Sequence, residues 1–282
     1  MRKIPYFLLL LLCLSCNGDY GNQEPSELVV EGWIDKGDFP VVFLTRTITL
    51  SDEYMDINEL EKYLERWARV TISDGVREEV MVGHIDRSYY PPFYYTTSFM
   101  RGEAGKTYHL HVQCQDGLTA DAETTMTDAT ALIDSFWVEP VDFTDTLFTL
   151  KAHVDLEHST ARYFKLFTQH NRRLRNTTSS MLGLFSRDMV SNGEIVINKG
   201  RSNLDREYIS SFSVNDTVHI RLAALNDGQY EFWRAFEDMI FLSRNPLFPS
   251  TENLPSNVSS GIGYWHAYTT SHYVIPIREL VK

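Results

Sequence analysis

KTYHLHVQCQDGLTADAETTM, residues 106–126, is the stretch of sequence that decides the fold class. Apolar and polar residues alternate on both sides of the QDG at residues 115–117, which is typical of two half-buried antiparallel strands joined by a tight turn. Residues 69–73 (RVTIS) alternate in the same way and are followed by the DG at residues 74–75. These two hairpin signals predict a mainly β protein.

Two domains are expected around this stretch. Short strands separated by turn residues predict an N-terminal immunoglobulin-like antiparallel β-sandwich over residues 27–127. Longer strands follow, and within residues 229–242 Phe232, Phe236, Met239 and Ile240 share one helical face. We therefore expect a second β-rich domain over residues 128–282, with one packed helix near 229–242. Its expected strands are residues 131–139, 147–156, 161–170, 193–198, 208–214, 217–225 and 272–277.

A short helix is expected to interrupt the first domain. The capping-box pattern of residues 56–59 precedes Leu60, Tyr63, Leu64 and Trp67, which lie on one helical face. This spacing predicts a helix that packs on the edge of the sheet through these four side chains.

The N-terminal residues indicate export and a lipid anchor. Residues 1–15 join a positive start to an apolar run that is too short to span a bilayer. The Ser-Cys that ends this run resembles a bacterial lipoprotein signal, in which the cysteine is acylated. The alternative is an ordinary secretory signal with an incidental cysteine. We expect residues 1–15 to be a lipoprotein signal peptide, Cys16 to be lipidated and residues 16–26 to be a flexible tether.

Composition excludes several classes of protein. The chain has 282 residues, of which 43% are hydrophobic, and this is ample for a core and excludes an intrinsically disordered chain. The formal charge of −12 makes nucleic acid an unsuitable partner, because binding its phosphates requires a basic face. Three cysteines cannot form a disulfide framework, and no second apolar run is long enough for a transmembrane helix.

An aromatic segment around the Pro-Pro of residues 91–92 is the candidate recognition loop. Its aromatic residues are Tyr89, Tyr90, Phe93, Tyr94 and Tyr95. A stiff, amphipathic loop of this kind suits stacking on sugar rings or docking to a partner protein. Alternatively, alternate rings are buried in the sandwich and the prolines only shape the turn. The sequence leaves both interpretations open.

Three histidines are the candidates for a metal site. His109 and His111 lie on one face of a predicted strand, and His84 from a neighbouring strand would complete a zinc or copper site of three nitrogens. The strict alternation of this strand instead favours a polar outer face, so we expect no metal there. Cys114 lies on the apolar side of the same strand, which predicts a small buried hydrophobe rather than a nucleophile.

Catalytic signatures are absent from the sequence, which has no P-loop, no Gly-x-Ser-x-Gly and no His-Glu-x-x-His. The GIG of residues 261–263 lacks the third glycine of a dinucleotide-binding motif, and it predicts a tight backbone approach or a bulge. We therefore expect no enzyme and no cofactor.

Several stretches, in this order along the chain, together resemble a family of Bacteroidetes outer-membrane lipoproteins that is classed as domain of unknown function 4249. They are Cys16, LVVEGWID (residues 28–35), ARVTISDG (68–75), YHLHVQCQDGLTADAETTM (108–126), the aromatic helix after NDG (226–228) and NPLFPSTENLPSNVSSGIGYW (245–265). The resemblance covers nearly the whole mature chain, and the predicted helix at 59–67 departs from it.

The resemblance carries expectations about function. Members of the family are often encoded beside TonB-dependent outer-membrane receptors. This implies an accessory role beside such a receptor. We therefore expect a non-enzymatic lipoprotein that is anchored to the outer membrane, at the cell surface rather than the periplasmic face. It would act as an accessory or ligand-capture subunit for an unknown small ligand in nutrient uptake. The alternatives are a structural or assembly lipoprotein of the outer membrane without a small ligand, and a metal-dependent hydrolase built on the three histidines. The family has no established catalytic residues to carry over.

Overall fold

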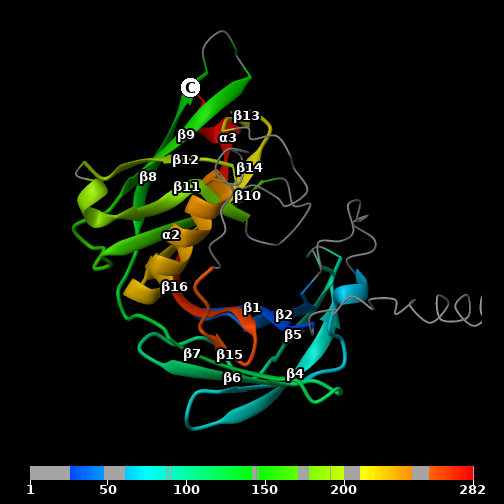
Figure 1. The fold of residues 1–282 in the computed structure, drawn as a ribbon. Helices are drawn as coiled ribbons and strands as arrows, with labels where there is room; N and C mark the ends of the chain where they lie inside the picture. The colour runs from blue at the N-terminus through cyan, green and yellow to red at the C-terminus, as the bar shows by residue number, and fades with distance from the viewer. Residues whose placement is uncertain are drawn as a thin grey trace, which may run out of the picture.

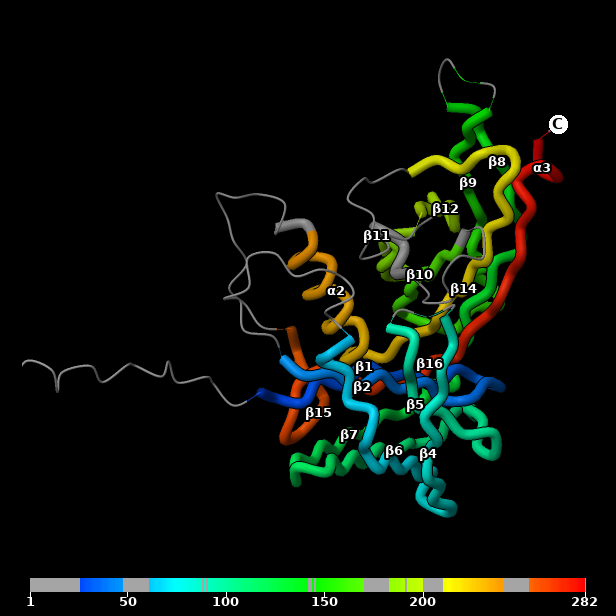
Figure 2. The backbone as a smooth tube through the Cα atoms, turned by 90° about the vertical axis from the view of Figure 1, so that its right-hand side faces the viewer, coloured from blue at the N-terminus to red at the C-terminus, as the bar shows by residue number. Residues whose placement is uncertain are grey.

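The two halves of the molecule, residues 26–127 and residues 128–281, are joined by strand β16 (Ile262–Pro276). Its first part pairs in parallel with β1 (Leu28–Asp35), and its second part pairs antiparallel with β14 (Thr217–Leu225). Figures 1 and 2 show this long strand running from the upper half of the view down to the lower half. One strand therefore belongs to both halves.

The structure is a computed structural model. It describes residues 26–47, 61–87, 89, 91–141, 144, 146–170, 178–190, 192–199, 210–242 and 254–281. Among these residues, no helix has both the length and the apolar character needed to cross a membrane.

The described elements are mainly strands, as predicted. The other strands are β2 (Val41–Arg46), β3 (Arg69–Ser73), β4 (Glu78–Ile85), β5 (Phe93–Thr96), β6 (Thr107–Gln113), β7 (Thr119–Thr125), β8 (Ile133–Pro140), β9 (Leu147–Val154), β10 (Tyr163–His170), β11 (Thr178–Ser186), β12 (Glu194–Ile197), β13 (Phe212–Ser213) and β15 (Val258–Ser259). The helices are η3 (Arg187–Met189), α2 (Asp227–Leu242) and α3 (Ile277–Leu280).

These strands form two sheets. The larger sheet has the order β11-β10-β14-β16-β1-β2-β5-β4-β3-β6-β7-β15, and the smaller sheet contains β12, β9, β13 and β8. Because β1 and β16 run parallel, the larger sheet is mixed. The prediction of purely antiparallel pairing in the first half is therefore wrong for this pair of strands, and the isolated bridge between Lys36 and Gly102 is also parallel. The partner strand lies more than 200 positions away, so no local turn signals the pairing.

The first hydrophobic core lies inside the curved part of the large sheet. Strand β4 pairs with β5 on one side and with β3 on the other, and the apolar faces of the strands on both sides meet in this core. Trp265 of β16 is fully buried there, and its Nε1 donates to the backbone oxygen of Tyr108 at 3.1 Å. The C-terminal strand thus supplies the largest side chain of a core that is otherwise built mostly from the first half.

Gly263 allows β16 to approach β1. Its φ is +117°, and a Cβ built at this position would lie 1.9 Å from the backbone oxygen of Val30. Only glycine fits such a contact. The tight approach predicted from the GIG of residues 261–263 is confirmed.

The second core lies between the two sheets of the second half. Alternate residues of β9 on one side and of β14 on the other fill it. Helix α2 covers the opposite face of the large sheet, where Phe232 and Trp233 pack against Phe167 and Tyr268. This helix begins two residues before the prediction.

The predicted helix over residues 56–67 is wrong in the part that the structure describes. Residues 61–63 form one 3₁₀ turn, and residues 48–60 lie outside the described residues. Leu64 then bridges to Thr45, and the Glu65 amide donates to the backbone oxygen of Leu44 at 2.9 Å. The backbone joins the edge of β2 instead of continuing a helix, and Trp67, predicted to pack, is 73% exposed.

The division into two domains at residues 127 and 128 stays a prediction. The two cores lie on either side of this point, but Val258, Trp265 and Ala267 from beyond it contribute to the first core. Thr269 also donates a hydrogen bond to the backbone oxygen of Thr127. The C-terminal strand thus fastens the link between the halves.

Candidate functional site: a cleft between the two halves

A cleft opens on the same face of the large sheet as helix α2, over the part of that face that the helix does not cover. Along β14, Ala223 and Leu225 lie beneath α2, whereas His219 and Arg221 point to the same face farther along and line the cleft. Because alternate side chains of a strand point to the same face, one face of β14 both packs against the helix and forms one wall of the cleft.

The cleft has a volume of about 670 Å³, which is in the range of small-molecule sites. Its described lining comes from both halves. The first half contributes Trp33, Asp35, Asp38, Phe39, Val41, His84, Tyr89, Tyr94, Thr96, Thr97 and Ser98, and the second half contributes Phe167, Gln169, His219, Ile220, Arg221, His272, Tyr273 and Val274.

A buried ion pair lies in the lining of this cleft. Arg221 donates to Oδ2 of Asp35, and both residues are only 5% exposed. The Arg221 guanidinium lies over the ring of Phe167 at 4.0 Å. Burial raises the pKa of Asp35 above its usual value, although the charge and hydrogen bond of Arg221 oppose this rise. Oδ1 of Asp35 is buried and has no hydrogen-bond partner among the described residues.

Two further polar side chains approach Asp35. Asp38 follows it in a tight turn, closed by the hydrogen bond from the Asp38 amide to the Asp35 backbone oxygen at 3.0 Å. His272 of β16 lies directly opposite Arg221 in the sheet register. Ligand atoms of Asp35, Asp38 and His272 all lie within 4.8 Å of one another.

One part of the predicted recognition segment lines the cleft. The rings of Tyr89 and Tyr94 lie 4.9 Å apart, and both contact Phe43 at 5.8 Å. His84 meets Tyr94 edge-on at 5.5 Å, and Trp33 meets Phe43 at 5.9 Å. These rings form an aromatic wall on the first half.

The other part of that segment belongs to the first core. Tyr95 is 3% exposed. Its hydroxyl accepts a hydrogen bond from the Ala68 amide at 3.0 Å and donates one to the backbone oxygen of Glu65 at 3.1 Å. Burial raises the pKa of this phenol. Phe93 packs against the same core and meets Tyr95 edge-on at 5.3 Å. Tyr90 lies outside the described residues. Alternate side chains of β5 therefore point to opposite sides: Phe93 and Tyr95 pack in the core, whereas Tyr94 lines the cleft. Each of the two interpretations that the sequence left open holds for one part of the segment.

The structure does not bring the three predicted histidines together. His109 and His111 pair with carboxylates on the outer face of β7, at 3.2 Å and 2.7 Å. His84 lies in the cleft instead. Cys114 is buried as predicted, and burial raises the pKa of its thiol to about 11, which removes it as a nucleophile.

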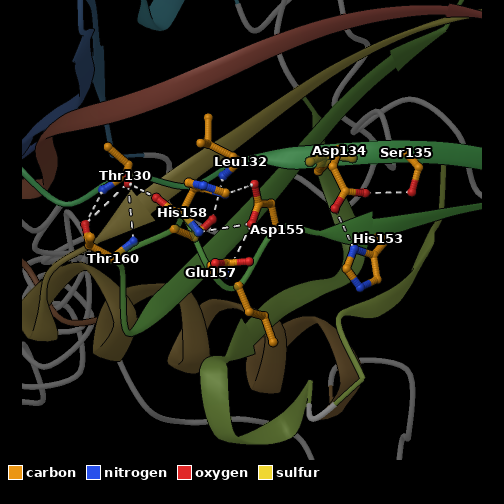
Figure 3. A network of polar contacts seen from close by, with 12 residues as sticks. Thr130, Leu132, Asp134, Ser135, His153, Asp155, Glu157, His158 and Thr160 are labelled. Carbon is orange, nitrogen blue, oxygen red and sulfur yellow. Dashed lines mark hydrogen bonds and ion pairs between the residues drawn. The ribbon is translucent and has the colours of Figure 1, made fainter.

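A second polar cluster has the residue types of a catalytic triad in the wrong order. The Ser135 hydroxyl donates to Asp134 at 2.6 Å, and Asp134 lies 2.8 Å from Nδ1 of His153 (Figure 3). In a serine hydrolase the histidine lies between the serine and the carboxylate, where it accepts the hydroxyl proton. Here the carboxylate lies between them, so the imidazole cannot activate Ser135 in this arrangement.

A second group of hydrogen bonds in Figure 3 lies just after the segment that links the two halves. Asp155 accepts from the amides of Glu157 and His158 at 3.1 Å and 3.0 Å, while Thr130 and Thr160 exchange hydrogen bonds between backbone and side chain (Figure 3). These contacts fix the turn before β10 to the start of the second half. Their role is structural.

Sequence reasoning missed the polar residues of the cleft. The DKGD of residues 35–38 signals a turn that brings two acids together, because the glycine can take the positive φ that such a turn requires. Arg221 interrupts the otherwise apolar run of residues 220–225, which is a signal for a buried, paired charge. His272 has no such signal, since only the pairing of β14 with β16 brings it to the site.

The fold and the cleft define a mainly β protein whose halves share one strand and enclose a pocket of small-molecule size. The family model described as a domain of unknown function (DUF4249) matches residues 17–273, and the chain belongs to this family. The resemblance read from the sequence is therefore confirmed. No curated protein matches the chain.

Proposed function

We propose that this protein is a non-enzymatic outer-membrane lipoprotein that captures a small ligand as an accessory subunit of a TonB-dependent receptor. The observation that carries the proposal is the cleft between the halves. Its volume of about 670 Å³ suits a small molecule, and both walls combine aromatic rings with polar side chains.

The chemistry of the lining favours binding over catalysis. Trp33, Tyr89 and Tyr94 offer ring faces and edges for an apolar or sugar-like surface. Arg221 and Asp35 neutralise each other, so neither is an isolated charge in the pocket. Such a site orients a ligand through stacking and a few polar contacts.

The sequence supports the anchored location. Lipidation of Cys16 would hold the folded part to the outer membrane, at the cell surface rather than the periplasmic face, through the tether of residues 16–26. Anchoring beside a receptor raises the effective concentration of the two proteins, so a modest interface suffices. The link to the receptor rests on the resemblance to the family.

For residues 27–127 we also propose the immunoglobulin-like sandwich. The antiparallel pairs β3–β6 and β6–β7, facing β1 and β2 across one core, support it. An experimental structure whose strand connections differ from the immunoglobulin arrangement would refute this part.

Co-purification from native membranes tests the function. Protein isolated in mild detergent should bring down a TonB-dependent receptor that mass spectrometry identifies. A cleft variant, Trp33→Ala with Tyr94→Ala, should lose small molecules that co-purify with the wild type. Met189→Ala is the control, because Met189 is exposed and does not line the cleft.

The outcomes separate the candidate functions. A receptor without any cleft-dependent small molecule would favour the alternative, a structural or assembly lipoprotein of the outer membrane. Absence of a receptor from the purified protein would refute the accessory role.

A further inference from the structure

We propose that Asp35, Asp38 and His272 bind a divalent transition-metal ion in the cleft. One ligand atom from each residue lies within 4.8 Å of the other two. Atoms that bind one ion at about 2.1 Å are separated by at most about 4.2 Å. A small rotation of the two exposed side chains, Asp38 and His272, therefore completes the contact.

Local structure brings the three residues together. Asp35 ends β1, and the turn to Asp38 has Gly37 at a φ of +82°, a conformation that glycine adopts without strain. The first and last residues of such a turn lie close together, and one carboxylate oxygen of Asp35 lies within 4.8 Å of one of Asp38. His272 comes from β16, the strand that pairs with β1 up to Asp35.

The independent observation is the buried oxygen of Asp35. Arg221 occupies Oδ2, whereas Oδ1 has no hydrogen-bond partner among the described residues. Leaving a buried carboxylate oxygen unsatisfied costs free energy, so such an atom requires an explanation. A bound cation would satisfy it.

The hydrogen bond of His272 is compatible with a metal ligand. Nε2 of His272 lies 3.0 Å from Oγ1 of Thr270, and in the tautomer that carries its proton on Nε2 the ring donates to this hydroxyl and offers Nδ1 to an ion. Imidazoles that bind metals usually donate their other ring N–H to an oxygen, which fixes the orientation of the ring.

The surrounding charges permit a cation. Asp35 and Asp38 bring two carboxylates, and among the described cationic side chains only Arg221 forms an ion pair with Asp35. Arg101 also lies near, donating to the backbone oxygen of Gly37 at 2.6 Å, and its guanidinium is stacked on Phe39 at 3.8 Å. Lys36, the residue after Asp35, is exposed and its backbone bridges to Gly102.

The donor set selects the kind of ion. Two carboxylate oxygens with one imidazole nitrogen suit Mn²⁺, Fe²⁺, Co²⁺ or Zn²⁺, while Ca²⁺ and Mg²⁺ prefer oxygen alone. Three protein ligands leave coordination positions open toward the cleft, for water or for an oxygen of a captured ligand.

Metal titration tests the proposal. The full chain, purified without a polyhistidine tag and stripped with chelator, is titrated with Zn²⁺ and Mn²⁺ by calorimetry and with Co²⁺ by its visible absorption. We expect one equivalent to bind and to raise the melting temperature. Asp38→Asn and His272→Gln should each weaken binding by about tenfold or more. These exposed residues are chosen because Asp35→Asn would leave Arg221 buried without its partner.

The control is His109→Ala with His111→Ala, which removes two exposed histidines on another face. This variant should bind the ions as the wild type does. Absence of binding of all three ions, binding that survives in both Asp38→Asn and His272→Gln, or binding that disappears in the control would each overturn the proposal. Co-purification of a receptor is a separate measurement, so the two proposals can fail independently.

Discussion

Asp35 and Arg221 are 186 positions apart in the sequence and form a buried ion pair in the cleft. Asp35 ends β1 and Arg221 lies in β14, and β16 separates these two strands in the sheet. Since two buried charges must remain paired, this contact couples the first half of the molecule to the second.

Breaking this pair should destabilise the whole fold. We expect Arg221→Met to lower the free energy of unfolding by about 3–5 kcal/mol, because it leaves the Asp35 carboxylate buried without its partner. Urea denaturation followed by circular dichroism measures the change. Lys151→Met is the control: its partner Glu139 lies 2.7 Å away at the surface, and the expected loss is at most about 1 kcal/mol. Equal losses in both variants would contradict the coupling.

Mutations in the aromatic segment should differ in their effect on stability according to which side of β5 the residue lies on. Tyr95→Ser removes a core ring and should cost about 3–5 kcal/mol of unfolding free energy. Tyr94→Ser removes contacts with Phe43 and Tyr89 at the cleft, and should cost about 1–2 kcal/mol. Thermal unfolding of the two neighbouring variants compares them directly. The parity argument is refuted if Tyr94→Ser is the more damaging change.

Gly263 should tolerate no side chain. Gly263→Ala places a Cβ 1.9 Å from the Val30 oxygen, so it should separate β16 from β1 and lower the melting temperature by many degrees. Gly117→Ala is the matched control, since Gly117 also has a positive φ of +91° but meets nothing within 4 Å. Its strain alone should cost about 1 kcal/mol. Similar melting temperatures for both variants would show that the close approach is not required.

Asp74 should make stability depend on pH at the acid end. Backbone hydrogen bonds from Arg77 and Val76, with Lys106 nearby, lower the pKa of Asp74 to about 2. A carboxyl whose folded pKa lies below its unfolded value of about 3.9 stabilises the fold above about pH 4 and loses this effect as pH falls toward 2. Asp74→Asn should therefore lower the urea midpoint at neutral pH. The difference from wild type should shrink between about pH 4 and pH 2.5, and a constant difference would contradict the assignment.

The lipid anchor can be tested by fractionation. If Cys16 is lipidated, Cys16→Ala should move the protein from the membrane fraction to the soluble fraction of the cell envelope, because the variant lacks the cysteine that would carry the acyl chains. Immunoblotting of the two fractions measures the distribution. If the variant stays on the membrane in unchanged amount, the lipoprotein prediction is wrong.

Local pattern predicted much of the fold. The alternation of residues 107–113 and 119–125 and the turn between them appear as β6 and β7, since each strand buries one face against its immediate neighbour. Helix α2 was equally readable because Asn226 and Gln229 exchange side-chain to backbone hydrogen bonds that fix its start. Elements stabilised by neighbours in sequence can be found from sequence.

Long-range pairing could not be predicted in this way. The expected strand of residues 272–277 is the second half of β16, and nothing local indicates that its first half pairs with β1. For the same reason the cleft remained hidden. Asp35 and His272 become neighbours only through that pairing. The aromatic segment could be recognised as a candidate site because its residues are contiguous in the sequence.

The position of β16 in the chain has a consequence for biosynthesis. During translation β1 and β14 are both synthesised before β16, and each has one unpaired edge until β16 is complete. Unpaired edges invite association with other chains. The nascent protein therefore stays prone to aggregation until β16 has been synthesised, and nonsense mutations before residue 262 should yield insoluble fragments rather than a folded first half.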